Sequence, residues 1–135
     1  MKKILIVEDE LPLREALVDK LKLEGIETIE ASNGEEGLRI ALQEKPDMIL
    51  LDVIMPVMDG ITMLKKLRED SWGEGVRVLV LSNLSEGDKV EEAMNEGAFD
   101  YLVKSNWKIG DVIDKVKEKL QTLNTPSVLT LGMFR

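Results

Sequence analysis

Hydrophobic positions follow two different spacings along this chain. Short apolar or alternating runs, typical of strands, cover Lys2–Val7, Ile26–Ala31, Asp47–Leu51, Val76–Leu81 and Phe99–Val103. Between these runs, apolar residues recur every three or four positions, which is typical of a helix with one buried face. We therefore predict five strands that alternate with five helices.

The expected helices begin and end at recognisable residues. Gly25 follows the first helix, Leu11–Glu24, as a glycine often follows the last helical turn. Asn33, with Glu36 three residues later, is close to a capping-box pattern and begins a helix that extends to about Glu44. Apolar stripes around Leu64, Ala93 and Val116 mark the remaining three helices.

This order of elements predicts an α/β fold. Strands joined through helices pair in parallel by right-handed crossovers, so we expect a doubly wound five-stranded sheet with helices on both faces. The run Asp47–Leu51 is continuously apolar after its first residue, which indicates a central strand covered on both faces. Folds of this kind bind ligands at the carboxyl ends of their strands.

Polar residues follow four of the five predicted strands. Glu8 and Asp9 follow the first strand, Asp52 the third, Ser82 the fourth and Lys104 the fifth. Taken singly, Glu8-Asp9 and Lys104 are more often solvated surface residues and Ser82 is more often a helix cap, whereas Asp52 alone is as readily a turn or cap residue as a functional one. Because all four strand ends meet at one edge of a parallel sheet, the combination favours a functional site.

The residue types at this edge indicate phosphoryl chemistry. Crowded carboxylates repel one another, and a divalent cation relieves that repulsion. The chain has no histidine and no cysteine, so its oxygen ligands favour Mg²⁺ or another hard cation. Asp52 is then a candidate nucleophile toward phosphorus, with Lys104 and Ser82 as partners of the phosphoryl oxygens. No predicted strand end carries a glycine-rich phosphate-binding loop.

Composition narrows the classes of function. The 135 residues suit one domain, and no apolar run approaches the ~20 residues of a membrane span. The apolar run at the N-terminus stops at Glu8, too short for a signal peptide, so we expect a cytoplasmic protein. A net charge of −8 disfavours non-specific binding to nucleic acid. Without histidine, the chain cannot carry its own phosphohistidine or a Ser-His-Asp triad.

Four stretches, in order, resemble a known family. They are ILIVEDE, LLDVIMPVMDG, VLVLSN and AFDYLVKS, and they are distributed between Met1 and about Leu123. Together they resemble the response-regulator receiver domains of two-component signalling, in the single-domain form typical of chemotaxis regulators. The resemblance implies a flavodoxin-like receiver fold with strand order 2-1-3-4-5.

The resemblance also implies roles for single residues. Asp52 would accept a phosphoryl group from a partner's phosphohistidine. Mg²⁺ would be bound by Asp9, Asp52 and the backbone carbonyl of Ile54, with Glu8 helping through water. Lys104 would contact the phosphoryl oxygens, Ser82 would be the switch hydroxyl, and Tyr101 would swing between exposed and buried rotamers.

The implied partners are proteins. A histidine kinase or a histidine phosphotransfer protein would supply the phosphoryl group. The output would be a downstream protein or a self-dimer, contacted through the fourth helix, the fifth strand and the fifth helix. We expect no nucleic-acid or membrane partner.

The chain departs from the family pattern beside the site. Ser105 follows Lys104 where the family usually has proline, so the bond is either trans with a shifted loop or a strained cis bond. Asn83 replaces a small residue after Ser82, and its amide either reaches or obstructs the phosphoryl group. Ile54 and Leu84 are apolar and cannot orient water, so we expect slow autodephosphorylation.

The last twelve residues lie beyond the receiver pattern, which gives residues 1–123 to the receiver domain and residues 124–135 to a tail. The tail is too apolar for a solvated linker, and Pro126 separates it from the last helix. Two interpretations remain open. The tail is a disordered remnant, or it docks on this domain, a second subunit or a partner.

Three other functions compete with the receiver hypothesis. A flavin or nucleotide enzyme shares this architecture, but its first loop would offer glycines and hydroxyls rather than Glu8 and Asp9. An aspartyl-phosphate phosphatase would carry a second aspartate two residues after Asp52, where Ile54 stands. A receiver-like interaction module without phosphorylation is the third, and the complete acidic set argues against it.

Overall fold

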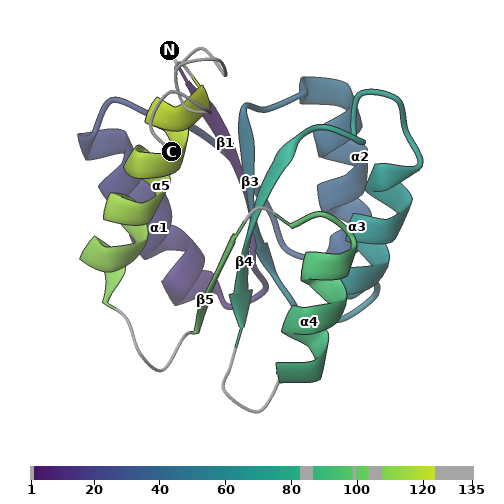
Figure 1. Cartoon of the computed structure of the whole chain (residues 1–135). Helices are drawn as coiled ribbons and strands as arrows, with labels where there is room; N and C mark the ends of the chain where they lie inside the picture. The colour runs from purple at the N-terminus through teal and green to yellow at the C-terminus, as the bar shows by residue number, and fades with distance from the viewer. Residues whose placement is uncertain (1, 83–86, 99, 104–107, 124–135) are drawn as a thin grey trace, which may run out of the picture.

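The structure is a computed structural model that describes residues 2–82, 87–98, 100–103 and 108–123. Within these ranges, strands and helices alternate from one end to the other (Figure 1). They are β1 (Lys3–Val7), α1 (Leu11–Leu23), β2 (Glu27–Ala31), α2 (Gly34–Glu44), β3 (Met48–Asp52), α3 (Gly60–Arg68), β4 (Arg77–Ser82), α4 (Gly87–Asn95), β5 (Asp100–Val103) and α5 (Ile109–Leu123).

The five strands form one parallel sheet in the order β2-β1-β3-β4-β5. This confirms the predicted doubly wound fold and its strand order. Strand order reverses between β1 and β3, which lie next to each other although a helix, a strand and a second helix separate them in sequence. A crevice at the carboxyl ends of two such strands is where folds of this class bind ligands.

Helices cover both faces of the sheet, as Figure 1 shows. α1 and α5 pack on one face, over a core that includes Ile6, Leu50 and Val116. α2, α3 and α4 lie on the other face, over a core that includes Leu51 and Leu64. Every residue of β3 is buried, which confirms the central position predicted from its continuous apolar run.

The predicted helix ends have the expected local chemistry. Gly25 has φ +77°, and its N–H donates to the carbonyl of Lys22 at 3.0 Å, which completes the end of α1. Asn33 caps α2, because its side chain accepts a hydrogen bond from the Glu36 N–H at 2.9 Å. The side chain of Glu36 accepts in return from the backbone N–H of Ser32, at 2.9 Å.

Two strands extend one residue beyond their predicted ends. β3 includes Asp52, which pairs with Leu81, and β4 includes Ser82, which pairs with Val103 of β5. Both functional candidates are therefore held by the sheet itself rather than by a following loop.

Several sequence predictions lie outside the described residues. They concern Asn83, Leu84, Lys104, Ser105 and the tail at residues 124–135. Peptide bonds are trans throughout the described part of the chain, which does not include the bond between Lys104 and Ser105. None of the described helices combines the length and the apolar character that crossing a membrane requires.

Candidate functional site

Three carboxylates meet at the carboxyl ends of β1 and β3. Glu8, Asp9 and Asp52 each place one carboxylate oxygen so that these atoms all lie within 4.8 Å of one another. The sheet register explains the meeting. Val7 pairs with Leu51, and the residues that follow these two in the chain are Glu8 and Asp52. The cluster therefore stands at the point where the strand order reverses.

The cluster is largely buried. Glu8 is 0% exposed and Asp52 is 3% exposed, whereas Asp9 is exposed to solvent. Three carboxylates this close together concentrate negative charge in a largely buried place, and a cation held between them would offset that charge. The donor set consists of oxygen atoms, with one member open to water, and it fits a hard divalent cation such as Mg²⁺.

Ser82 brings a hydroxyl to the neighbouring strand end. It follows Leu81, which pairs with Asp52, and it is 0% exposed. Its Oγ is buried and has no hydrogen-bond partner among the described residues. A buried hydroxyl without a partner is costly, so this group is available to a ligand that reaches the strand ends.

The loop after Asp52 returns tightly onto the strand. The Val53 N–H donates to the Leu81 carbonyl at 3.2 Å, and the Gly60 N–H donates to the Val53 carbonyl at 2.8 Å. A Cβ atom at Gly60 would collide with the backbone carbonyl of Asp52. Only glycine therefore permits the start of α3 to lie against the candidate phosphoacceptor.

The same loop is held from its far side by the start of α2. The Gly34 N–H donates to the Met58 carbonyl at 2.9 Å, and a Cβ atom at Gly34 would collide with that carbonyl. Asp59 caps α3 by accepting a hydrogen bond from the Thr62 N–H at 2.7 Å. Between these anchors, Ile54 is 56% exposed.

The remaining predicted residues belong to β5 or follow it. Tyr101 is on β5 and is 42% exposed. Val103 pairs with Ser82, so the chain leaves β5 beside the candidate hydroxyl. Lys104, the next residue, lies outside the described residues.

Two features at this site had no counterpart in the predictions from sequence. One is the close approach of Gly60 to Asp52, for which the Asp-Gly pair at the end of LLDVIMPVMDG signals only a turn. The other is the Arg14 side chain, which donates to the backbone carbonyl of Glu8 at 2.7 Å. The acceptor of this hydrogen bond is a backbone atom, so no pattern of residue types in the sequence predicts the bond.

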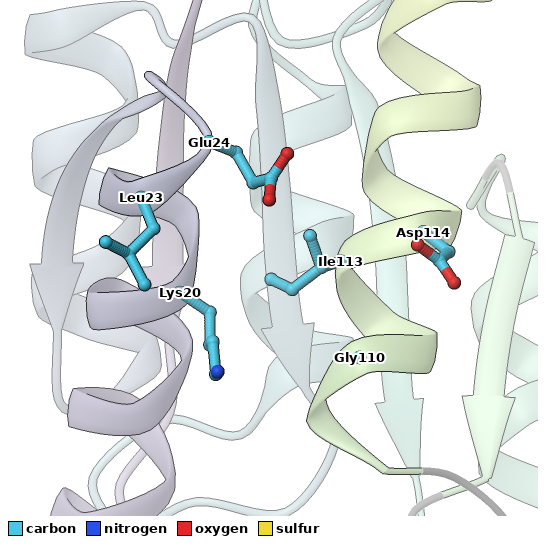
Figure 2. Close-up of a pocket in the computed structure, with 6 residues that line it drawn as sticks. All are labelled: Lys20, Leu23, Glu24, Gly110, Ile113 and Asp114. Atoms are coloured by element: carbon cyan, nitrogen blue, oxygen red, sulfur yellow. The ribbon is translucent and has the colours of Figure 1, made fainter.

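A separate pocket of about 270 Å³ lies between α1 and α5, lined by Lys20, Leu23, Glu24, Gly110, Ile113 and Asp114 (Figure 2). A salt bridge of 2.8 Å joins Lys117 to Glu24, which holds the pKa of Lys117 above its ordinary value. The pocket lies toward the end of α1, whereas the carboxylates adjoin the start of that helix. None of the predicted site residues lines it, so the site is placed at the carboxylates.

Comparison with known proteins agrees with this geometry. The family model described as the response regulator receiver domain matches residues 4–117. The chain is 36% identical to sporulation initiation phosphotransferase F of Bacillus subtilis over 87% of this chain and 93% of that protein. It is 35% identical to the phosphate regulon transcriptional regulatory protein PhoB of Pseudomonas aeruginosa, over 76% of this chain and 45% of that protein.

Solved structures show the same likeness. The chemotaxis response regulator CheY4 of Vibrio cholerae superposes with a TM-score of 0.80 at 30% identity, over 87% of this chain and 98% of that chain. Together with the family match and the position of the acidic cluster, this favours the receiver hypothesis over a flavin or nucleotide enzyme. The chain belongs to the response regulator receiver domain family of two-component systems.

Proposed function

We propose that Asp52 is the phosphoacceptor of this receiver domain and takes its phosphoryl group from a phosphohistidine, in a Mg²⁺-dependent reaction. The observation that carries the proposal is the buried cluster in which oxygens of Glu8, Asp9 and Asp52 lie within 4.8 Å of one another. Its position at the carboxyl ends of β1 and β3 leaves one side open through the exposed Asp9.

In the proposed reaction, a carboxylate oxygen of Asp52 forms a bond to phosphorus. The bond between phosphorus and the imidazole nitrogen of the donor breaks, and the nitrogen keeps the electron pair. Asp9, Asp52 and the carbonyl of Ile54 would hold Mg²⁺, and Glu8 would do so through water. When bound, the cation offsets negative charge on the transferring phosphoryl oxygens.

The other residues act on the product. The buried Oγ of Ser82 lacks a partner among the described residues, and it would donate a hydrogen bond to the acyl phosphate. Lys104 would contact the same oxygens. Slow loss of the phosphoryl group follows from Ile54, an exposed apolar side chain that cannot orient an attacking water. Ile54→Asn should therefore release inorganic phosphate faster than the wild-type chain.

The output surface is proposed to be α4, β5 and α5. Ser82 ends β4 just before α4 in sequence, so a hydroxyl drawn to the phosphoryl group would bias the position of α4. Met94 on α4 and Tyr101 on β5 are 38% and 42% exposed, which leaves apolar surface for a protein partner. The proposed donor is a histidine kinase or a histidine phosphotransfer protein.

Acetyl phosphate with MgCl₂ tests the proposal without a cognate kinase. Intact-mass spectrometry should show the addition of one phosphoryl group, which disappears with EDTA and in Asp52→Asn. Asp59→Asn is a matched control, because it removes a carboxylate from the same loop while asparagine still caps α3. Modification of Asp52→Asn at the wild-type level would refute the assignment of the acceptor.

A further inference from the structure

Arg14 connects α1 to the edge of the sheet that carries the carboxylates. It lies in the first turn of α1, where its backbone N–H donates to the Glu10 carbonyl at 2.9 Å. Its side chain is only 15% exposed, which is low for an arginine at the start of a surface helix. The side chain therefore points toward the sheet, where it lies against the ends of β1 and β2.

The guanidinium group contacts both of these strand ends. Its Nη1–H donates to the backbone carbonyl of Glu8 at 2.7 Å, and its Nε–H donates to Oε1 of Glu30 on β2 at 3.1 Å. A planar guanidinium can make both bonds at once, because its N–H groups point in fixed directions. The ammonium of a lysine lacks that fork.

The carbonyl that Arg14 holds belongs to the peptide unit between Glu8 and Asp9. A peptide unit is planar, so an oxygen held in place limits the rotation of the whole unit. On the other side of Glu8, its N–H donates to the Ala31 carbonyl at 3.0 Å. The Glu10 N–H also donates to Oε2 of Glu8 at 3.1 Å, which orients the buried carboxylate.

We infer that Arg14 is a positioning residue for the cation site: it fixes the Glu8–Asp9 peptide so that both carboxylates are oriented to hold a divalent cation. The inference rests on the proposed function for the identity of that cation. Residues that hold the metal ligands in place without contacting the metal typically matter for affinity: their removal weakens metal binding by about 10–100-fold.

A purely electrostatic role and a purely structural role for Arg14 predict different results. If Arg14 acts only through its charge, its removal strengthens Mg²⁺ binding, since a cation near the site repels another. If Arg14 only attaches α1 to β2, its removal lowers the stability of the fold and leaves the affinity for Mg²⁺ unchanged. Of the three roles, only a positioning role predicts weaker Mg²⁺ binding both in Arg14→Gln, which removes the charge, and in Arg14→Lys, which keeps it.

The test is the dissociation constant of Mg²⁺ by isothermal titration calorimetry, at a temperature where circular dichroism shows every variant folded. Arg14→Gln and Arg14→Lys should each bind Mg²⁺ about tenfold more weakly than the wild-type chain. Arg39→Gln is the matched control, because it removes the same charge from an exposed position on α2. It should stay within about twofold of wild type, because charges on a solvated surface are screened.

Binding by Arg14→Lys at the wild-type level would overturn the inference, and so would tighter binding by Arg14→Gln. If Arg14→Gln does not fold, Arg14→Lys decides the matter alone, because it keeps the charge and part of the packing. Failure of the wild-type chain to bind Mg²⁺ would instead refute the proposed metal dependence, and the inference with it. The wild-type titration therefore separates the two failures.

Discussion

Arg68 joins the end of α4 to the loop that precedes β4, and its replacement is predicted to destabilise this half of the molecule. Its Nε–H and Nη2–H donate to the carbonyls of Glu96 and Gly97, at 2.9 and 2.8 Å. Its Nη1 donates to the carbonyls of Gly73 and Val76, at 2.7 and 2.8 Å. Two of these acceptors directly follow the last residue of α4, and at the C-terminal end of a helix carbonyls lack partners of their own and a cation is favourable.

The size of the effect follows from these four bonds. A hydrogen bond from a charged donor contributes about 1.5–3 kcal/mol to stability. The bond to Gly97 is exposed, so water replaces much of it once Arg68 is gone. Burial lowers the pKa of Arg68, which means that the guanidinium has lost hydration and that part of the gain is offset. For Arg68→Met, which keeps the apolar stem, we expect a loss of about 2–4 kcal/mol.

Urea unfolding followed by circular dichroism measures this loss, and the thermal midpoint should fall by about 8–15 °C. Arg68→Lys should lose nearly as much, because one ammonium cannot reach four carbonyls in two segments. Lys66→Met is the control, since it removes a charge from an exposed position on α3, the helix that ends at Arg68. Hydrogen exchange should also speed up at Glu96 to Ala98. The reasoning fails if both Arg68 variants stay within about 0.5 kcal/mol of wild type, the range of ordinary surface substitutions.

Three further predictions concern the site and its surroundings. Val57 has φ +69° and is 76% exposed, so Val57→Asn should stabilise the fold by about 1 kcal/mol in urea unfolding, because asparagine tolerates that backbone better than a β-branched residue. Gly60→Ala should cost about 1–3 kcal/mol and also slow modification by acetyl phosphate, since its Cβ displaces the carbonyl of Asp52; unchanged modification would contradict the close approach. Lys65 holds the pKa of Glu92 below its ordinary value of 4.5, so the pair stabilises the fold above pH 4.5, and this contribution is lost as the pH falls through the lowered pKa. In Glu92→Gln, the free energy of unfolding should therefore depend less on pH below pH 4.5 than it does in the wild-type chain. An unchanged dependence on pH would argue against the pair.

The architecture could be predicted from sequence because it depends on periodicity. Each described strand begins and ends within one residue of its predicted bounds, apart from β5, whose predicted first residue, Phe99, lies outside the described residues. The same reasoning placed Glu8, Asp52 and Ser82 at one edge, since parallel strands align their carboxyl ends. Strand periodicity does not report where a ladder stops, and the predicted strands therefore ended one residue before Asp52 and Ser82.

Backbone positions that side chains must avoid were harder to predict. Gly60 and Gly34 look like ordinary turn and helix-start glycines in sequence, yet each faces the carbonyl of a distant segment. Val57 was missed for a different reason: its φ is positive, and nothing about a valine in a sequence predicts a positive φ. Val57 and Gly60 lie between Asp52 and the first turn of α3, and Gly34 contacts that loop from the start of α2. A site that brings two chain segments into backbone contact therefore depends on geometry that residue types describe poorly.

The two arginines share the reason that they were missed. Arg14 and Arg68 both donate to backbone carbonyls, and every residue of the chain carries such an acceptor. A carboxylate partner at a helical spacing would have left a signal in the sequence, but Arg68 reaches Glu96 across 28 positions. The side chain of each arginine also contacts a segment with a proposed role. Arg14 contacts the backbone beside the carboxylates, and Arg68 contacts the turn between α4 and β5. If the proposed output surface is correct, Arg68 restrains the elements that must move, and its replacement would change the response to phosphorylation as well as stability.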